Sequence, residues 1–338
     1  MKYLVRYTFL FLAIALWAGG CSREVMKWYY QTNLVADDYR YGDLYRLANL
    51  SQFKDPLVAC REASTPVLSS DTARTHLYLI GDSFAEPQRI SKADFPVSYY
   101  QYVHWDTRHT AQLDTTKYNV LLLETVERHF REHFSRPVAE LTLVPDTTQR
   151  TTPTPEPLTR QLFALIQSKG IEERLETVLF SQDFFLWFKE LKAAMNLGWF
   201  DRTTPKVGIS HDRQHLFVDL DTDTTKRLNS SFVALPDSEL NALVDSVNAT
   251  AARFRQQGFD AVYLSVIPNK ASILEPERGA YNRLIERVQQ HPRLQVPIVD
   301  IYSVYARQPK QVYALGDSHW NCYGRSLWLK AVNERLAR

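Results

Sequence analysis

The chain has 338 residues, of which 45% are hydrophobic and 12% aromatic, enough to fill the core of one large domain or of one domain with an insertion. Its 40 basic residues nearly balance its 38 acidic residues. Lys and Arg form no dense run anywhere in the sequence, so nothing in it favours nucleic acid or another polyanion as a partner.

The first 20 residues have the pattern of an export signal. Lys2 and Arg6 flank the start of an apolar stretch, Tyr7 to Ala18, and two glycines then lead directly into Cys21. A cysteine at this place is typical of lipoprotein signals, in which the thiol receives lipid and becomes the new N-terminus. An uncleaved anchor or a simple cleaved signal is the alternative, although the stretch is short for a membrane span. All three place the remaining chain outside the cytoplasm, and the first predicts a membrane-anchored lipoprotein facing the periplasm or the cell surface.

Two further cysteines, Cys60 and Cys322, follow Cys21. They can pair in an oxidising compartment, but the sequence does not show that they meet, and two separate buried thiols are an equal alternative. Neither stands in a CxxC or CxxH spacing, so we expect no zinc site, and no motif predicts a cofactor.

The segment 22–75 mixes short helical pieces with aromatic residues, and we expect it to wrap the domain formed by residues 76–338. Within that domain, short aliphatic runs predict buried strands at Leu77–Ile80, Tyr99–His104, Val120–Leu123, Ala261–Ile267 and Val296–Ile301. The tail from Tyr323 onward has apolar residues at helical spacing. Strands that alternate with helices predict a three-layer α/β fold, a mostly parallel sheet with helices on both faces.

The composition changes between residues 136 and 229, where we expect an insertion that caps one edge of the domain. It begins with a linker or surface loop rich in Thr and Pro, Thr151 to Pro157. Two helices, Pro157–Phe180 and Asp183–Asn196, and a hairpin, Val207–Leu220, are expected to follow. Such caps often shape a substrate groove, and a purely structural lobe is an equal alternative.

A Gly-Asp-Ser turn follows the first predicted strand, in the segment HLYLIGDSF. Ligands of parallel α/β sheets bind beyond the carboxyl ends of the strands, and Ser83 stands at such an end. Gly81 permits a tight turn, and a following helix would present backbone amides to an oxyanion. The same tripeptide recurs from Gly316 to Ser318, before the last helix, so it does not by itself identify a nucleophile.

The second Gly-Asp-Ser continues into His-Trp-Asn. An Asp two residues before a His can approach Nδ1 of the imidazole while Nε2 faces a serine, which predicts a Ser83–His319–Asp317 triad. In the simpler alternative, Asp317 caps the last helix and His319 lies on the surface. A plain cap needs neither the indole of Trp320 nor the amide of Asn321, so the cluster favours the triad.

These two segments resemble the SGNH (GDSL-type) hydrolase superfamily, whose first block is a Gly-Asp-Ser turn and whose last block is an Asp and a His by the C-terminal helix. The Asp-x-His-Trp-Asn form resembles the alginate O-acetyltransferase-like, DHHW-type branch. Three further segments are similar to that branch: LLLETVER (121–128), ISHDRQHLF (209–217) and VIPNK (266–270). The chain departs from the branch in placing the Ser before the Asp and His. It also lacks the second-block Gly and the third-block Gly-x-Asn-Asp of the superfamily.

The resemblance implies a flavodoxin-like sheet and a serine enzyme, an O-acetyltransferase or O-acetylesterase, that acts on a cell-envelope or extracellular glycan. It also implies a membrane acyl-export protein as the acyl donor. The missing blocks keep a second function open, a carbohydrate-binding envelope lipoprotein on the same fold without turnover.

Because the chain lacks the second and third blocks of the superfamily, its oxyanion donors must come from other residues. We assign one donor to the backbone N–H of Ser83 and a second to Thr125 or Arg128, after the third predicted strand. For Glu124, Glu127 and Arg128, an internal salt bridge that fixes the following helix is an equal alternative.

Several side chains are candidates for contacts with the substrate. Asn269 and Lys270, just past the fourth predicted strand, either contact a polar substrate or only end the strand. Trp320 and Asn321 are further candidates because they adjoin His319. Three aromatic residues suit stacking on sugars, and they suit a protein core equally: Tyr99, Tyr100 and Trp105.

Overall fold

The computed structural model describes residues 2–22, 74–143, 171–180 and 183–337, with shorter stretches between residues 25 and 60. The chain divides into two compact units, Met1–Pro56 with Thr147–Thr203 and Leu57–Asp146 with Thr204–Arg338. The expected N-terminal segment, 22–75, and the expected insertion, 136–229, are each divided between these units. The expected loop 151–157 and the first part of the helix expected to follow it, 157–170, lie outside the described residues.

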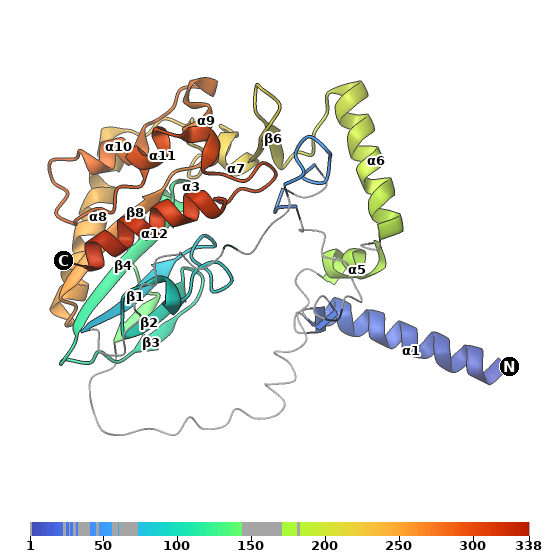
Figure 1. Ribbon diagram of the computed structural model, residues 1–338, viewed down its shortest axis with the longest axis horizontal. Coiled ribbons are helices and arrows are strands. Elements are labelled where there is room, and N and C mark those ends of the chain that lie inside the picture. Colours follow the sequence, from blue (N-terminus) through green and yellow to red (C-terminus); the bar gives the residue numbers. More distant parts are fainter. Residues whose placement is uncertain are drawn as a thin grey trace. The chain divides into compact units, whose positions relative to one another are not determined.

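A parallel four-stranded sheet in the order β2–β1–β4–β8 forms the centre of the second unit (Figure 1). Its strands are β1 (Thr75–Gly81), β2 (Tyr99–His104), β4 (Tyr118–Val126) and β8 (Ala261–Ile267). The register aligns Ile80 with Val103 and Leu123, so the carboxyl ends of the strands meet at one edge. These are the first four predicted strands. The third is longer than expected, and Glu124 and Thr125 lie within it rather than after it.

The fifth predicted strand, Val296–Ile301, is wrong. Among the described residues this segment forms a single parallel bridge, Ile298 to Leu264, through the Pro297 carbonyl and the Val299 N–H. Extending the ladder backwards would need an N–H at position 297, which proline lacks. The segment therefore lies beside β8 without forming a strand.

Two hydrophobic cores lie on opposite faces of the sheet because successive side chains of a strand point to opposite faces. Tyr78, Ile80, Leu121 and Leu123 pack with α3 (Glu127–His133), α8 (Asp237–Gln256) and α10 (Leu284–Gln289). Leu77, Leu79, Val120 and Leu122 pack with α11 (Tyr302–Ala306) and α12 (Cys322–Leu336), the red helix of Figure 1. A parallel sheet with helices on both faces is consistent with the predicted three-layer α/β fold.

Smaller elements complete the second unit. The predicted hairpin is confirmed, with β6 (Val207–Ile209) antiparallel to β7 (Leu216–Val218). A second pair of strands, β3 (His109–Ala111) and β5 (Leu141–Leu143), is parallel. The remaining short helices are η1 (Lys92–Asp94), α7 (Asp219–Thr222), α9 (Lys270–Leu274), η2 (Pro276–Arg278) and η3 (Pro309–Gln311).

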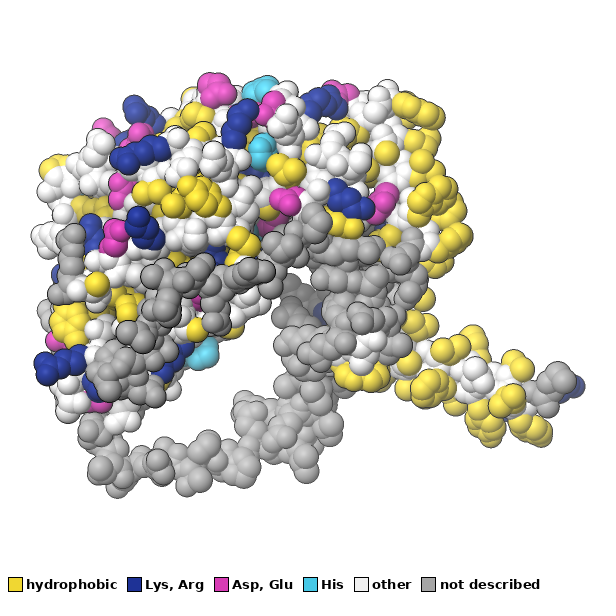
Figure 2. Space-filling model, viewed as in Figure 1, with side chains coloured by type: hydrophobic (Ala, Val, Ile, Leu, Met, Phe, Trp, Pro, Cys, Tyr) yellow, Lys and Arg dark blue, Asp and Glu magenta, His cyan; other side chains and the backbone are white. Residues whose placement is uncertain are grey.

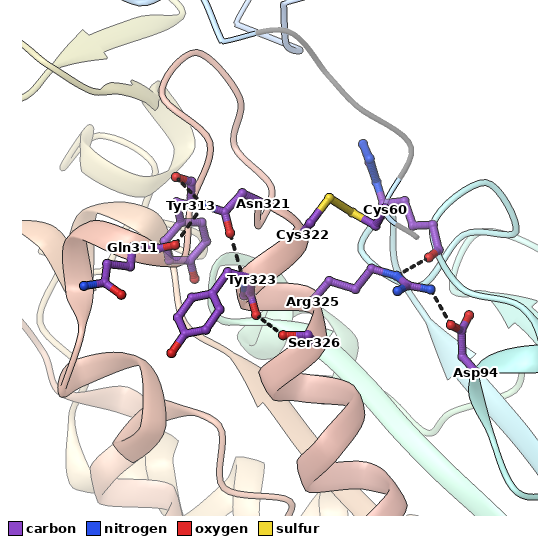
Figure 3. Close-up of a disulfide and its surroundings, with 11 residues drawn as sticks. Cys60, Asp94, Gln311, Tyr313, Asn321, Cys322, Tyr323, Arg325 and Ser326 are labelled. Atoms are coloured by element: carbon purple, nitrogen blue, oxygen red, sulfur yellow. Dashed lines mark hydrogen bonds and ion pairs between the residues drawn. A yellow bond between two sulfur atoms is a disulfide. The ribbon is translucent and has the colours of Figure 1, made fainter. Parts of the chain in front are cut away.

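The start of α12 is fastened by a disulfide and an ion pair (Figure 3). Cys60 and Cys322, whose pairing the sequence left open, are bonded with their Cα atoms 5.2 Å apart. One turn further along α12, Arg325 pairs with Asp94 and donates from Nε to the Arg89 carbonyl at 2.7 Å. Both links tie this helix to chain segments that precede β2.

The first unit contains α1 (Lys2–Cys21), α5 (Ile171–Phe180) and α6 (Asp183–Phe200). Among the described residues, α1 is the helix that is long and apolar enough to cross a membrane, and it fits either a signal peptide or an anchor. Its last residues pack on α5, where Arg174 donates to the Gly20 carbonyl at 2.8 Å. Cys21, the expected lipid-bearing residue, ends this helix and is buried. Figure 2 shows hydrophobic side chains exposed along α1 and along α6.

Candidate active site

Ser83 directly follows β1 in a tight turn that its neighbours define. The Phe84 N–H donates to Asp82 Oδ1 at 3.0 Å, which closes a local turn around Ser83. Glycine is needed at position 81, because a Cβ there would lie 2.6 Å from Glu124 Oε2. The turn presents the Ser83 hydroxyl at the carboxyl edge of the sheet, where the sequence predicted it.

His319 brings the two Gly-Asp-Ser segments together. Its Nε2 lies 2.8 Å from Ser83 Oγ, across 236 residues of sequence, and its Nδ1 lies 2.6 Å from Asp317 Oδ1. The same carboxylate oxygen accepts the His319 backbone N–H at 2.7 Å. The predicted Ser–His–Asp contacts are therefore present, while the catalytic roles of these residues stay a prediction.

The electrostatics around Asp317 fix the tautomer of His319. Burial by itself raises the pKa of the Asp317 carboxyl, but the interactions with His319, hydrogen bonds from its ring and its backbone N–H among them, outweigh burial and hold that pKa below its usual range. Arg89, which donates to the Ser83 carbonyl at 3.0 Å, contributes in the same direction. An ionised Asp317 can only accept, so Nδ1 carries the proton and Nε2 is left to accept the Ser83 O–H.

Lys270 holds the loop that carries Asp317. Its fully buried Nζ donates to the carbonyls of Ala314, Leu315 and Asp317. The ammonium group therefore donates to three carbonyl oxygens inside the protein. This corrects the expectation that Lys270 contacts a substrate, since its side chain positions the acid of the triad instead.

Trp320 and Asn321, the candidates beside His319, both make contacts inside the protein. The Asn321 side chain caps α12 by accepting the Gly324 N–H at 3.0 Å, which leaves Asp317 free of the capping role that the sequence allowed. Trp320 is buried between two rings, with its centroid 5.0 Å from that of Phe84 and 5.4 Å from that of Trp328.

Two of the candidate polar contacts, Thr125 and Asn269, point into the protein. The Thr125 hydroxyl is 2.8 Å from His133 Nδ1 and fully buried. The Asn269 amide accepts the Arg128 N–H at 3.1 Å and donates to Ser231 Oγ at 2.8 Å. Internal hydrogen bonds therefore occupy both side chains, which corrects their assignment to the oxyanion and the substrate.

Arg128 lies closer to the triad but is paired with another group. Its guanidinium carbon is 5.8 Å from the centroid of the Phe84 ring, which in turn is 4.6 Å from the imidazole of His319. Its Nη1 lies 3.4 Å from the fully buried carboxylate of Asp221. The expected ion pair is therefore made with Asp221 rather than with Glu124 or Glu127.

The Ser83 backbone N–H is the donor that the turn leaves available for an oxyanion, the role that the sequence predicted for it. The N–H groups on either side of it are used, since Asp82 donates to Glu124 Oε2 at 2.9 Å and Phe84 donates to Asp82. Among the described residues, no acceptor takes the Ser83 N–H. This donor matches the one assigned from the sequence.

Of the three aromatic residues that suited either sugar stacking or a protein core, two pack inside the protein. Trp105 is buried, stacks on His133 and donates to the Glu124 carbonyl at 2.7 Å. Tyr100 packs on Phe95, and burial raises its pKa. Tyr99 is exposed, but it opens β2 at the end of the sheet opposite Ser83. They do not form a sugar-binding groove beside the triad.

Sequence reasoning weighed Glu124 and Glu127 as salt-bridge partners of Arg128, but it did not predict that both are buried carboxyl groups at this edge of the sheet. Glu124 lies under the Ser83 turn and is fully buried; burial and the Asp82 charge raise its pKa well above the usual range. Glu127 accepts the Asn269 N–H at 2.9 Å and the Ser272 hydroxyl, and burial raises its pKa to about 7. The available signal was an acid inside an aliphatic run, VLLLETV, because a buried acid needs a specific partner.

Comparisons of the chain with protein-family models, with curated proteins and with solved structures find no match. The function is therefore inferred from the geometry of the site.

Proposed function

We propose that this chain is an extracytoplasmic serine acyl-group enzyme of the SGNH type, an O-acetylesterase or O-acetyltransferase that acts on a cell-envelope or extracellular glycan. One observation carries the proposal, the hydrogen-bonded series from Ser83 Oγ through the imidazole of His319 to the buried carboxylate of Asp317. This series can activate a hydroxyl that is otherwise a weak nucleophile.

In the first half of the reaction, Ser83 Oγ attacks the carbonyl carbon of an ester while its proton passes to His319 Nε2. The carbonyl electron pair moves onto oxygen, and the Ser83 N–H donates to the resulting oxyanion. When the tetrahedral intermediate collapses, the bond to the leaving oxygen breaks and Nε2 returns the proton to that oxygen. An alcohol leaves, and the acyl group stays on Ser83.

In the second half, a hydroxyl attacks the acyl carbon and gives its proton to Nε2, and Ser83 Oγ leaves and recovers that proton. Attack by water yields a carboxylic acid, so the enzyme is an esterase. Attack by a sugar hydroxyl yields an acetylated glycan, so the enzyme is a transferase. The resemblance to the DHHW-type branch favours the transferase, with a membrane acyl-export protein supplying the acyl group.

The N-terminus fits this role. An apolar helix that ends at Cys21 supports export and attachment to a membrane through a lipid on that cysteine or through the helix itself. Either attachment would hold the acyl-group site beside a membrane-bound donor and outside the cytoplasm, where envelope glycans lie.

A fluorophosphonate probe tests the enzyme class, since it labels a serine that a neighbouring base activates. We expect the wild-type protein to be labelled and Ser83→Ala to be unlabelled. Failure of the wild type to react would overturn the proposal and favour the carbohydrate-binding lipoprotein on the same fold.

Mass spectrometry of the acyl-enzyme separates the two chemistries. After exposure to a chromogenic acetyl ester, we expect an acetyl group on Ser83 that water removes slowly. A glycan that is the true acceptor would accelerate its loss and gain the acetyl group. If water removes the acetyl group faster than every polysaccharide offered, the transferase half of the proposal fails.

A further inference from the structure

Two carboxyl groups, Asp82 and Glu124, lie against each other beneath the Ser83 turn. Asp82 is 5% exposed and Glu124 is fully buried. Both oxygens of Asp82 accept backbone N–H groups, Oδ1 from Phe84 at 3.0 Å and Oδ2 from Val126 at 2.6 Å. Hydrogen bonds accepted at both oxygens favour the ionised form of a carboxyl group.

Glu124 has a different set of partners. Its Oε2 accepts the Asp82 N–H at 2.9 Å, whereas its Oε1 has no partner among the described residues although it is buried. Burial raises the pKa of the Glu124 carboxyl, and the charge of Asp82, whose own N–H binds Glu124, raises it further above its usual range. A buried oxygen without a donor is costly for a carboxylate, but it is ordinary for the hydroxyl oxygen of a neutral acid, which donates.

The surroundings offer little to neutralise two negative charges. Arg128, whose charge lowers the pKa of Glu124, is already paired with Asp221. From β2, the Tyr102 hydroxyl donates to the Gly81 and Asp82 carbonyls rather than to either carboxyl group. Two adjacent buried carboxyl groups with so little compensation hold one proton between them.

We propose that Glu124 is a neutral acid that donates its proton to an ionised Asp82, and that this shared-proton pair positions the Ser83 turn. The pair joins the end of β1 to the end of β4, because Asp82 also binds Val126 and Glu124 also binds the backbone of Asp82. Glu124 is therefore a positioning residue. Its effect on catalysis rests on the proposed function, whereas its protonation does not.

The protonation is tested by infrared spectroscopy of the full chain at neutral pH. The carbonyl stretch of a neutral carboxyl group is separate from the bands of ionised carboxylates. We expect such a band in the wild type and its loss in Glu124→Gln. Since the pKa of Glu127 is about 7, its carboxyl contributes to the same region, and Glu127→Gln serves as the matched control. A wild-type spectrum that Glu124→Gln leaves unchanged would overturn the proposal.

The positioning role is tested with two substitutions of Glu124 and the rate of fluorophosphonate labelling. Gln has the shape of the neutral acid and keeps both hydrogen bonds, one accepted from the Asp82 N–H and one donated to its carboxylate. Ala removes both, so the turn shifts and labelling slows by about a hundredfold. We expect Gln to recover most of that loss. Labelling as slow in Glu124→Gln as in Glu124→Ala, with both variants folded, would contradict the role.

The two experiments separate this inference from the proposed function. A wild type that does not react with the probe but shows the Glu124 band would overturn the enzyme and leave the proton pair standing. A reactive wild type without the band would overturn the pair and leave the enzyme standing.

Discussion

The chain contains the tripeptide Gly-Asp-Ser twice, and the two copies contribute different atoms to one site. In Gly81-Asp82-Ser83 the serine faces His319, and the carboxylate is held by backbone N–H groups. In Gly316-Asp317-Ser318 the carboxylate faces His319, and the serine is buried.

Both copies fold locally in the same way. Each Asp accepts the N–H of the residue two positions later, at 3.0 Å for Asp82 and 2.7 Å for Asp317. The roles diverge at the next contact, which is Val126 for Asp82 and the ring of His319 for Asp317. The tripeptide thus specifies a turn, and its position in the fold specifies the chemistry.

The largest effect should separate the two serines. Ser83→Ala removes the nucleophile, so we expect ester turnover to fall by about four orders of magnitude or more, with no probe labelling. Ser318→Ala, the matched control in the other turn, should still be labelled. Labelling that persists in Ser83→Ala and disappears in Ser318→Ala would reverse the two roles.

The second effect separates the two aspartates. Asp317→Asn keeps the shape of the side chain but loses the charge that sets the tautomer of His319, so we expect turnover to fall by about 10³–10⁴-fold. Asp82→Asn leaves one of two backbone donors without its acceptor, so it should lower the free energy of unfolding by about 1–3 kcal/mol. Because it also weakens the Asp82–Glu124 pair, it should slow turnover, but less than Asp317→Asn does. Turnover and denaturant unfolding of both variants check the contrast. A larger loss of turnover in Asp82→Asn would contradict it.

The stability difference between wild type and Asp317→Asn should depend on pH. The pKa of Asp317 is lower in the folded protein than its ordinary value of 3.8, so its ionised form stabilises the fold. That contribution is fully present above pH 3.8 and is lost as the pH falls towards the folded-state pKa. Unfolding free energies measured from pH 7 downward should show the two proteins converging only below about pH 4. Convergence near neutral pH would contradict this pairing.

A third effect concerns Lys270, whose buried ammonium group donates to three carbonyls around the second turn. Lys270→Met removes a donor from three carbonyls, those of Ala314, Leu315 and Asp317, so we expect the free energy of unfolding to fall by at least about 2 kcal/mol and labelling of Ser83 to slow. Lys310→Met is the control, because Lys310 is 72% exposed and its pair with Asp212 lies at the surface. Equal effects of the two substitutions would show that Lys270 does not hold the loop.

These residues also show how far the sequence could predict the molecule. Aliphatic runs predicted four strands because burial on both faces requires such runs, and Pro297 explains why the fifth failed. The triad was predictable because Asp317 and His319 are neighbours and Ser83 follows a strand. Lys270 and Glu124 were not assigned their roles because their partners lie 42 to 47 residues away and are mostly backbone atoms, which leave no pattern in the sequence.

The smallest effect on activity should come from the disulfide, whose pairing spans 262 residues and was equally beyond prediction. Replacing Cys60 and Cys322 with Ser removes the covalent link between residue 60 and the start of α12, and we expect the free energy of unfolding to fall by about 2–5 kcal/mol. Labelling of Ser83 should stay close to that of the wild type, since Lys270, Asn321 and the Arg325–Asp94 pair still hold the loop and helix. Reduced wild type should match the double variant in denaturant unfolding. A loss of labelling at a temperature where the variant remains folded would mean that the disulfide, rather than Lys270, fixes Asp317 against His319.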